Sequence, residues 1–297
     1  MMKFQMIPLL AALLMIVSCQ EGGQFKTGRI LASKQVSAET LNLGKTTYME
    51  YCVQCHGING DGKGVSSTGM FPPPRNFKQG IYKFGNVVAG ELPHDEDFYK
   101  IIRHGLKGGA MLPWDISDKR LDAVTQYIKT FAPEAWEGED KKPGTKYDIP
   151  VDPFGEGRKL EAIEKGKRAY HITAACIQCH RGYETKADIS NWNKEINKVP
   201  LKNDEFAADL YLLKLQDSDY DYKTMPPDFT YHHVRYSHTT EDIVQRLMYG
   251  VNGSGMPGWK DVVTDEELWA LAYYVQSLKE LRNNPAREDL ILKLDNQ

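Results

Sequence analysis

The stretches that decide the fold are Cys52-Val53-Gln54-Cys55-His56 and Cys176-Ile177-Gln178-Cys179-His180, two copies of one five-residue pattern. The chain has 297 residues and five cysteines, and four of these cysteines lie in the two copies. The fifth, Cys19, follows an apolar stretch near the N-terminus. The use of cysteine therefore points to one kind of chemical site that occurs twice.

Two thiols three positions apart, with a histidine directly after the second, form the attachment signature of c-type haem. On a helical turn both sulfurs reach the two vinyl groups of one porphyrin, and the histidine is directed at the iron as its proximal ligand. We therefore expect two covalently attached haem c groups. Their attachment residues are Cys52, Cys55 and His56 for the first, and Cys176, Cys179 and His180 for the second.

Other kinds of site also contain paired cysteines. A thioredoxin-like dithiol uses one Cys-x-x-Cys pair and gives no reason for a second copy with the same histidine. A zinc site joins its two pairs across about 15 to 20 residues, whereas these copies lie 124 residues apart. Simple disulfides leave both histidines unexplained. The pattern therefore favours haem over these three alternatives.

The sequence around each copy repeats as well. Gly44-Lys45-Thr46-Thr47-Tyr48 precedes the first copy, and Gly166-Lys167-Arg168-Ala169-Tyr170 precedes the second. Farther along the chain, four residue pairs share an offset of 145 positions: Gly105 and Gly250, Gly108 and Gly253, Met111 and Met256, and Trp114 and Trp259. A module of about 100 residues therefore occurs twice in the sequence.

The periodicity of apolar residues predicts helices. Phe98, Ile101 and Ile102 stand at i, i+3 and i+4, and Gly105 lies where that helix would end. Two residue pairs are typical of capping boxes, which mark helix starts: Thr239 with Asp242, and Thr264 with Glu267. No alternating strand pattern of useful length occurs, so the sequence predicts an all-α fold.

These motifs, in this order, resemble the class I cytochrome c family, and the whole chain resembles a dihaem cytochrome c. The resemblance implies two tandem cytochrome c-like domains, each a small helical bundle around one covalent haem, over residues 38–133 and 159–284. It assigns the sixth position on iron to Met111 in the first domain and to Met256 in the second. A thioether is a soft ligand that favours ferrous iron and raises the reduction potential.

The resemblance also implies how each domain packs. Gly44 with Tyr48 would meet Tyr127, and Gly166 with Tyr170 would meet Tyr274, where two helices cross closely. In the family a proline-rich loop runs beside the haem edge, and its backbone supports the proximal histidine. The tryptophans that follow the two ligand methionines would pack on the porphyrin or in the ordinary core.

Other residues compete for the sixth position on iron. Met70 and Met225 precede prolines in the two proline-rich loops, and we interpret both as packing residues. The remaining histidines are more often surface or hydrogen-bonding residues than ligands, which leaves bis-histidine coordination as the less favoured alternative. They are His94, His104, His171, His232, His233 and His238.

The N-terminus predicts export. Residues 1–18 have the pattern of a signal peptide, and Ile16-Val17-Ser18-Cys19 resembles the bacterial lipoprotein box, in which Cys19 is lipidated. A plain signal peptide with an incidental Cys19 is the alternative. We expect residues 19–37 to form a flexible tether and the protein to be lipid-anchored to a membrane, in the bacterial periplasm or cell envelope.

The composition of the chain limits the classes of partner that we expect it to bind. The formal net charge of -3 leaves no basic excess to neutralise phosphates, so we expect no nucleic acid partner.

Residues 134–158 are rich in proline, glycine and charge and form the predicted linker, and residues 285–297 form a tail. The second half carries an insertion at 186–222. This insertion would shield haem, contact the first domain or dock a partner.

The expected function is single-electron transfer within a respiratory chain, either as a shuttle or as a subunit of a complex. The expected partners are redox proteins or a respiratory complex, and no small-molecule substrate is required. The alternative is an enzyme that resembles the dihaem cytochrome c peroxidases. Such an enzyme needs an open sixth position on one iron, whereas both halves here present a Met loop of the same design.

Overall fold

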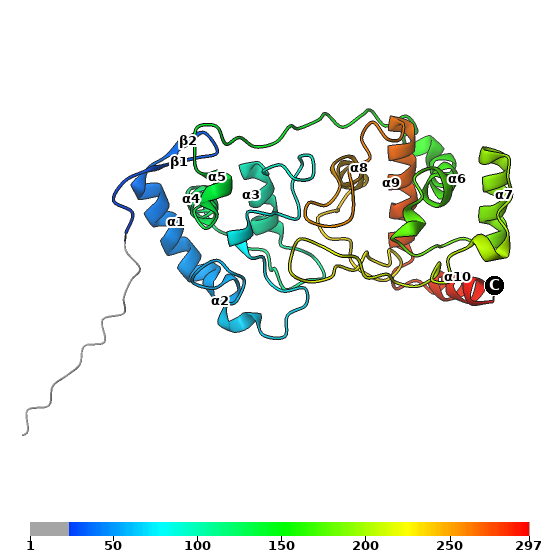
Figure 1. The fold of residues 1–297 in the computed structure, drawn as a ribbon, viewed down its shortest axis with the longest axis horizontal. Helices are drawn as coiled ribbons and strands as arrows, with labels where there is room; N and C mark the ends of the chain where they lie inside the picture. The colour runs from blue at the N-terminus through cyan, green and yellow to red at the C-terminus, as the bar shows by residue number, and fades with distance from the viewer. Residues whose placement is uncertain (1–23, 297) are drawn as a thin grey trace, which may run out of the picture.

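A computed structural model describes residues 24–296, which form two helical units side by side along the longest axis (Figure 1). The all-α prediction is confirmed. The first unit contains α1 (Ala38–Tyr51), α2 (Val53–His56), α3 (Asp95–His104), α4 (Asp118–Lys129) and α5 (Pro133–Trp136). The second contains α6 (Lys159–Arg168), α7 (Lys186–Asn197), α8 (Thr240–Tyr249), α9 (Asp265–Glu280) and α10 (Ala286–Asp295).

In the first unit, α1 crosses α4 at Gly44. Ser37 begins α1 by accepting a hydrogen bond from the N–H of Thr40 at 3.1 Å, as an N-cap side chain does. The ring centroids of Tyr48 and Tyr127 lie 5.4 Å apart across the crossing, in an edge-to-face arrangement. The packing implied by the family resemblance is confirmed here.

The second unit repeats this crossing with α6 and α9. Gly166 lies against the backbone of Ala270, and the ring centroids of Tyr170 and Tyr274 are 5.5 Å apart. A π-helical turn over Ala169–Thr173 separates α6 from the second Cys-x-x-Cys-His copy. Both predicted capping boxes are present, at the start of α8 and at the start of α9.

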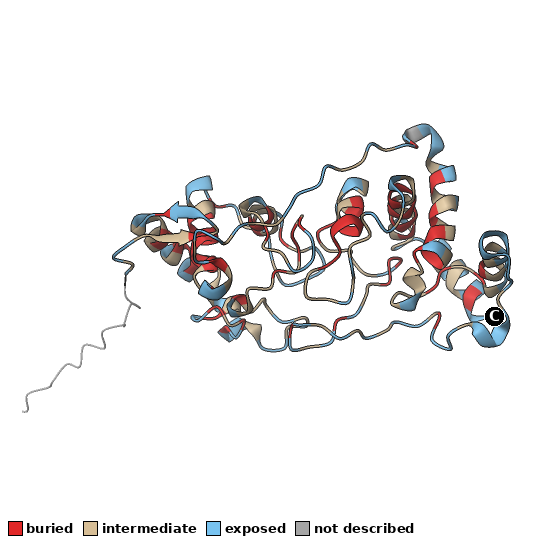
Figure 2. Cartoon of the chain, turned by 45° about the horizontal axis from the view of Figure 1, so that its top comes forward, coloured by how far each residue is buried: buried red, intermediate tan, exposed pale blue. Residues whose placement is uncertain are grey.

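The core of each unit lies between its crossed helices. Figure 2 shows buried residues along the inward faces of the helices and at points in the loops, while the outward faces of the helices are exposed. The largest side chains with less than 2% exposure include Tyr48 and Trp136 in the first unit, and Tyr170, Tyr249 and Tyr274 in the second. Large aromatic side chains therefore make up much of both cores.

Residues 29–36 differ from the predicted flexible tether of 19–37. They form an antiparallel hairpin of β1 (Arg29–Leu31) and β2 (Lys34–Val36), in which Leu31 is fully buried. Each strand has only three residues, too few for an alternating pattern to stand out in the sequence. The N–H of Ala32 donates to the carbonyl oxygen of Trp136 at 2.7 Å, so the hairpin belongs to the first unit.

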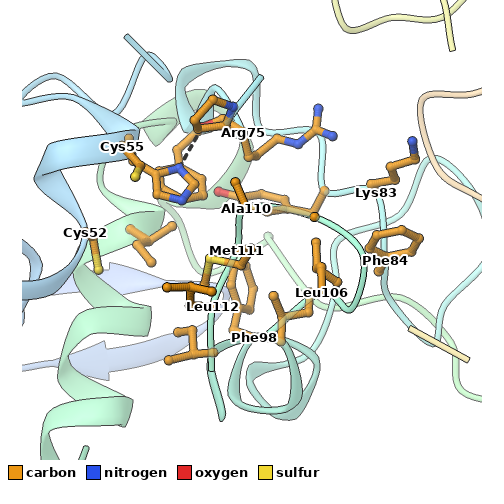
Figure 3. A pocket seen from close by; sticks show the side chains of 18 of the residues that line it. Cys52, Cys55, Arg75, Lys83, Phe84, Phe98, Leu106, Ala110, Met111 and Leu112 are labelled. Atoms are coloured by element: carbon orange, nitrogen blue, oxygen red, sulfur yellow. Dashed lines mark hydrogen bonds between the residues drawn. The ribbon is translucent and has the colours of Figure 1, made fainter. Parts of the chain in front are cut away.

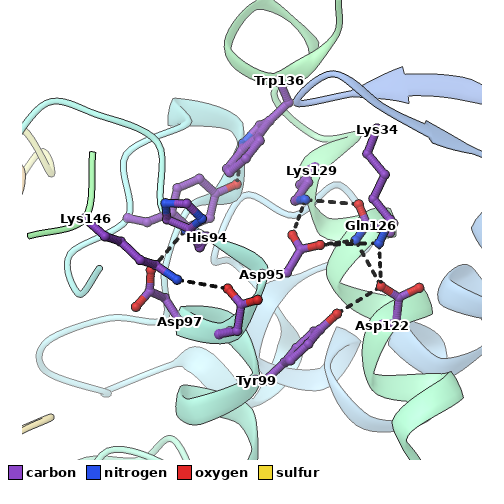
Figure 4. Close-up of polar contacts among 12 residues, drawn as sticks. Lys34, His94, Asp95, Asp97, Tyr99, Asp122, Gln126, Lys129, Trp136 and Lys146 are labelled. Carbon is purple, nitrogen blue, oxygen red and sulfur yellow. Dashed lines mark hydrogen bonds and ion pairs between the residues drawn. The ribbon is translucent and has the colours of Figure 1, made fainter. Parts of the chain in front are cut away.

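A polar network fastens this hairpin to the helices (Figure 4). Lys34 pairs with Asp122 of α4 at 3.0 Å and with Asp95 of α3 at 3.5 Å. Asp95 also pairs with Lys129, whose side chain is only 2% exposed. Burial lowers the pKa of Lys129, and Asp95 opposes that effect. This buried cation is therefore held with its carboxylate.

The segment between the units is anchored to them at several residues. Trp136, within the predicted linker of 134–158, is buried in the first unit. The backbone N–H of Tyr147 donates to the Tyr249 hydroxyl at 2.6 Å, and the Trp269 indole donates to the carbonyl oxygen of Pro150 at 2.8 Å. Phe154 lies in the core of the second unit. Side-chain contacts hold this segment although its composition is that of a linker.

The insertion at 186–222 contains α7 and then an extended segment that reaches the first unit. The Gln79 amide donates to a carboxylate oxygen of Asp221 at 2.9 Å, and the rings of Phe71 and Tyr222 meet at 6.1 Å. Of the three roles left open for the insertion, contact with the first domain is the one these interactions establish.

The two units share a small core of their own. Phe84 stacks on Tyr236 with ring centroids 5.5 Å apart and 12° between the ring planes. The Tyr236 hydroxyl donates to Asp97 at 3.2 Å, and Lys100 pairs with Asp242 at 2.5 Å. Apolar, hydrogen-bonding and ionic contacts therefore all cross the boundary. None of the helices between residues 24 and 296 is long and apolar enough to cross a membrane.

Candidate functional site

The first Cys-x-x-Cys-His copy lies where α1 gives way to α2. Cys52 ends α1 and precedes α2, so the chain turns at this residue. The Tyr48 hydroxyl donates to the carbonyl oxygen of Gly57 at 2.7 Å, which ties the end of the copy back to α1. Cys52, Cys55 and His56 are thereby held against one side of the first core.

Two contacts orient the His56 ring. Its Nδ1 atom lies 3.1 Å from the carbonyl oxygen of Arg75, and its plane stacks on Phe77 with centroids 4.5 Å apart and 18° between the planes. Because a carbonyl oxygen only accepts, Nδ1 carries the proton and Nε2 keeps its lone pair. Burial lowers the pKa of His56, which favours this neutral form. The backbone of the proline-rich loop supports the histidine, as the resemblance implies.

The Met111 loop is closed by backbone hydrogen bonds. The N–H of Leu106 donates to the carbonyl oxygen of Met111 at 2.8 Å, and the N–H of Trp114 donates to the carbonyl oxygen of Ile102 at 2.9 Å. Gly105 ends α3 with a φ of 62°, a conformation that favours glycine. Trp114 then meets Tyr51 edge-on at 5.4 Å.

One cavity of about 290 Å³ brings the predicted residues of the first half together. Cys52, Cys55, His56 and Met111 all line it, among mainly apolar and aromatic side chains (Figure 3). Its size is close to the lower end of the ~300–1,000 Å³ of small-molecule sites. Met70, the competing thioether, lines the same cavity.

The second half repeats the arrangement. His180 stacks on Phe229 with centroids 5.1 Å apart and 17° between the planes. The N–H of Val251 donates to the carbonyl oxygen of Met256 at 3.0 Å, as Leu106 does to Met111. Cys176 and Met256 both pack against the core of this unit. Burial lowers the pKa of His180 to about 4, and the carbonyl of Pro227 opposes that shift.

The two methionines that compete in the second half lie in different surroundings. Met256 is partly buried against the core of the second unit and against the cluster that joins the two units. Met225 is 41% exposed. The surroundings of Met256 are those an axial ligand needs, because a ligand must lie with the histidine inside the core.

The cysteines of both copies are chemically alike. Burial raises the pKa of Cys52 and of Cys176 to about 12 in each case. A redox-active dithiol needs a lowered pKa, since the thiolate is the nucleophile. In residues 24–296 no three His, Cys, Asp or Glu side chains gather as ligands for a metal ion. The environment therefore favours neither the dithiol nor the zinc alternative.

Most of the remaining histidines have hydrogen-bonding partners of their own. His171 is buried, with Nδ1 2.7 Å from the carbonyl oxygen of Lys167, and the Tyr183 N–H donates to its Nε2 at 3.2 Å. His94 meets the carbonyl oxygen of Gly144 at 2.8 Å, His232 accepts from Asp228, and His233 meets Arg282. None of the six lines the first cavity.

Two groups of site residues were not predicted from the sequence. Phe77 and Phe229 stack on the two histidines, and a Pro-x-x-Phe pattern, Pro74 to Phe77 and Pro226 to Phe229, marks both of them. Tyr222 and Arg235 of the second unit line the cavity of the first unit, and no local pattern points to them.

The residues present fit a covalently attached porphyrin. Two thiols, an imidazole with a free Nε2 and a thioether line one apolar cavity, and these are the donors of c-type haem. The Phe77 ring that stacks on His56 and the apolar lining would limit the access of water to a group held there. In the second unit Cys176 and Met256 pack against the core and His180 stacks on Phe229, although this copy begins in a 3-10 turn and not in an α-helix.

Comparisons with known proteins place the chain among the cytochromes c. The family described as cytochrome c oxidase, cbb3-type, subunit III matches residues 39–128 and 161–275. A solved chain of the reducing HAO-like protein complex of Kuenenia stuttgartiensis is 31% identical, with a TM-score of 0.62. The match covers 80% of this chain and 95% of that chain. No curated protein matches the chain.

Proposed function

Because this chain belongs to the cytochrome c family described as cytochrome c oxidase, cbb3-type, subunit III, we propose that it carries two haem c groups and passes single electrons in a respiratory chain. The observation that carries the proposal is the cavity lined by Cys52, Cys55, His56 and Met111. These side chains come from the junction of α1 with α2, from α2 and from the loop after α3, and they supply a complete donor set.

At the first site, Cys52 and Cys55 would form the thioethers, and His56 and Met111 would be the axial ligands. The haem supplies a one-electron change at iron. The Arg75 carbonyl holds His56 in the tautomer that leaves Nε2 free to bind. Phe77 fixes the plane of the ring. Ligands held in this way move little when the charge changes, which suits rapid electron transfer.

At the second site, Cys176, Cys179, His180 and Met256 would take the same four roles. The repeated stacking of histidine on phenylalanine supports a second haem. The repeated hydrogen bond that closes each methionine loop supports it as well. Two domain-sized segments match the same family, which agrees with one haem in each.

An electron carrier fits these sites better than a peroxidase. A peroxidase needs one iron with an open sixth position and an acid or base above it. Met111 lines the first cavity and Met256 packs in the second core, so each site offers a thioether for the sixth position. The chain needs no small-molecule substrate for electron transfer.

The partners proposed are redox proteins. The donor would be a quinol-oxidising or other membrane complex, and the acceptor a terminal oxidase or reductase. The similar solved chain belongs to a protein complex, which supports a role as a complex subunit as well as a shuttle. The signal peptide and Cys19 lie outside the described residues. They support export to the bacterial periplasm or cell envelope and a lipid anchor there.

A redox titration followed by visible and near-infrared absorption tests the proposal. Two one-electron steps are expected, and the oxidised protein should show the near-infrared band of sulfur-to-iron charge transfer. Peroxide added to the reduced protein should cause no catalytic turnover. A single step, a missing band or rapid peroxide turnover would contradict the proposed function.

A further inference from the structure

Three cationic side chains lie together at the first cavity. Arg75, Lys83 and Arg235 all line it. In Figure 3 the side chains of Arg75 and Lys83 lie on one side of the cavity, and the sulfurs of Cys52 and Cys55 lie on the other. The cavity therefore has a thiol side and a cationic side.

None of these three cations has a carboxylate partner among the described residues. The Arg75 guanidinium lies 3.9 Å from the ring centroid of Tyr220, and the Lys83 ammonium lies 5.6 Å from the same ring. Arg235 donates only to the carbonyl oxygen of Gly108, at 3.5 Å. Two buried cations elsewhere in the chain do have carboxylate partners: Lys129 pairs with Asp95, and Arg181 with Asp228.

The cations also repel one another. Burial and the charges of Arg75 and Arg235 together lower the pKa of Lys83 to about 8, with burial the largest cause. Like charges held together in a desolvated place cost free energy unless an anion offsets them. An anionic group bound at the cationic side of the cavity would therefore offset this repulsion.

A fourth cation lies behind this group. Arg246 is 6% exposed, and its guanidinium carbon lies 5.4 Å from the ring centroid of Phe84, which itself lines the cavity. It donates to the carbonyl oxygens of Gly85 and Gly250. Its Nε and Nη2 atoms have no hydrogen-bonding partner within residues 24–296. Arg246 thus adds a buried cation at the boundary between the units, where the carboxylates of Asp97 and Asp242 also act on it.

Both units contribute to this group. Arg75 and Lys83 belong to the first unit, whereas Arg235 and Arg246 belong to the second. Tyr222 of the second unit lines the cavity as well, and its ring meets Phe71 at 6.1 Å. The cationic side of the first cavity is therefore complete only when the two units are docked.

We propose that Arg75, Lys83 and Arg235 form a carboxylate-binding site shared by the two units, whose ligand is the propionate pair of the haem attached to Cys52 and Cys55. This rests on the proposed function. A porphyrin carries its two vinyl groups at one edge and its two propionates at the opposite edge. Thioether bonds on the thiol side of the cavity therefore direct the propionates toward the cationic side.

Two consequences follow from this assignment. The first haem becomes part of the boundary between the two units, because its propionates bind cationic residues of both units. The excess positive charge also raises the reduction potential of that haem, because ferric iron carries one more positive charge than ferrous iron and is destabilised by nearby cations.

The test compares Lys83→Met and Arg235→Gln with Lys223→Met in the full-length, haem-loaded protein. Lys223 is exposed and pairs with Asp217, so its removal changes the net charge equally without touching the cavity. One of the two redox steps should move to lower potential in the first two variants, by about tenfold in its equilibrium constant, or 59 mV. The other step, and both steps of Lys223→Met, should stay in place.

An infrared measurement identifies the carboxylate. With haem labelled with ¹³C at its propionate carboxyl carbons, the labelled bands in the oxidised-minus-reduced spectrum should shift in Lys83→Met and Arg235→Gln and stay unchanged in Lys223→Met. Haem present, with potentials and labelled bands unmoved, would overturn this assignment and leave the proposed function intact. A wild-type protein without covalent haem would overturn both.

A carboxylate from a partner protein is the other source of the same chemistry. Soluble poly-glutamate tests it: the wild type should not bind this polymer at 150 mM salt, because the propionates already occupy the cations. Binding by the wild type that is lost in Lys83→Met, together with unmoved labelled bands, would assign the cations to a docking partner and contradict the proposal.

Discussion

Gly44 of α1 lies so close to Ala123 of α4 that a Cβ atom at position 44 would stand 2.0 Å from the Ala123 carbonyl oxygen. The same relationship recurs between Gly166 and Ala270, at 2.1 Å. In both units this contact sets how closely the helix that leads into Cys-x-x-Cys-His approaches the later helix of the crossing. Where the thiols stand in each core therefore depends on one glycine.

The first prediction tests this contact. Gly44→Ala should lower the free energy of unfolding by about 2–3 kcal/mol, the upper part of the range for overpacked cores, because a backbone atom cannot move aside. Denaturant unfolding followed by circular dichroism measures the change. Gly157→Ala is the control, since a Cβ there meets nothing within 4 Å. Equal stabilities of the two variants would contradict the close crossing.

The second prediction concerns His171. Burial lowers its pKa from 6.5 to about 4. As the pH falls below 6.5, the His171 side chain of the unfolded chain becomes protonated, whereas that of the folded chain stays neutral until about pH 4. The unfolded state is therefore favoured progressively, and the stability present above pH 6.5 is lost between pH 6.5 and pH 4. The loss attributable to His171 is about 3 kcal/mol.

Unfolding free energies measured between pH 7 and pH 4 check this dependence. His171→Gln should flatten the profile in that window, whereas His238→Gln, at an exposed position, should leave it as it is. A profile of unchanged steepness in His171→Gln would show that another group causes the acid sensitivity.

The third prediction concerns the axial ligand of the second site. Met256→His should keep the haem attached and lower the potential of one redox step, by a sizeable part of the ~0.8 V over which axial ligands set haem potentials. Met225→Leu should move neither step, because Met225 lies at the surface. The opposite pattern would make Met225 the ligand.

The fourth prediction concerns membrane attachment. Cys19→Ser should release the protein into the soluble fraction of the cell envelope, because the substitution removes the proposed site of lipidation. Cell fractionation and immunoblotting measure the distribution. Retention of the variant on membranes would argue against lipidation of Cys19.

Local patterns in the sequence predicted much of the fold. The capping residues Thr239 and Thr264 begin α8 and α9, and Gly105 ends α3, because these side chains act within one turn of their own position. The gathering of Cys52, Cys55, His56 and Met111 in one cavity also agrees with the motifs. The duplication of the module made these motifs easier to identify, since each motif has a second copy for comparison.

Contacts between residues far apart in the sequence could not be predicted from local patterns. Arg235 lines a cavity in a unit whose attachment motif lies about 180 residues earlier, and only the docking of the two units brings it there. Leu31 is buried because the hairpin meets Trp136, a contact between distant segments. The length of the insertion hid the match between Phe77 and Phe229, which stand at different distances from their histidines.

The number of haem groups that stay on the chain after acid-acetone extraction is the most direct measure of the central claim. Pyridine haemochrome absorbance, divided by protein concentration, should give two covalent haems per chain for the wild type. It should give one for Cys52→Ala and one for Cys176→Ala. A colourless wild type, a pigment that acid-acetone removes, or a value of two that survives either substitution would contradict the account.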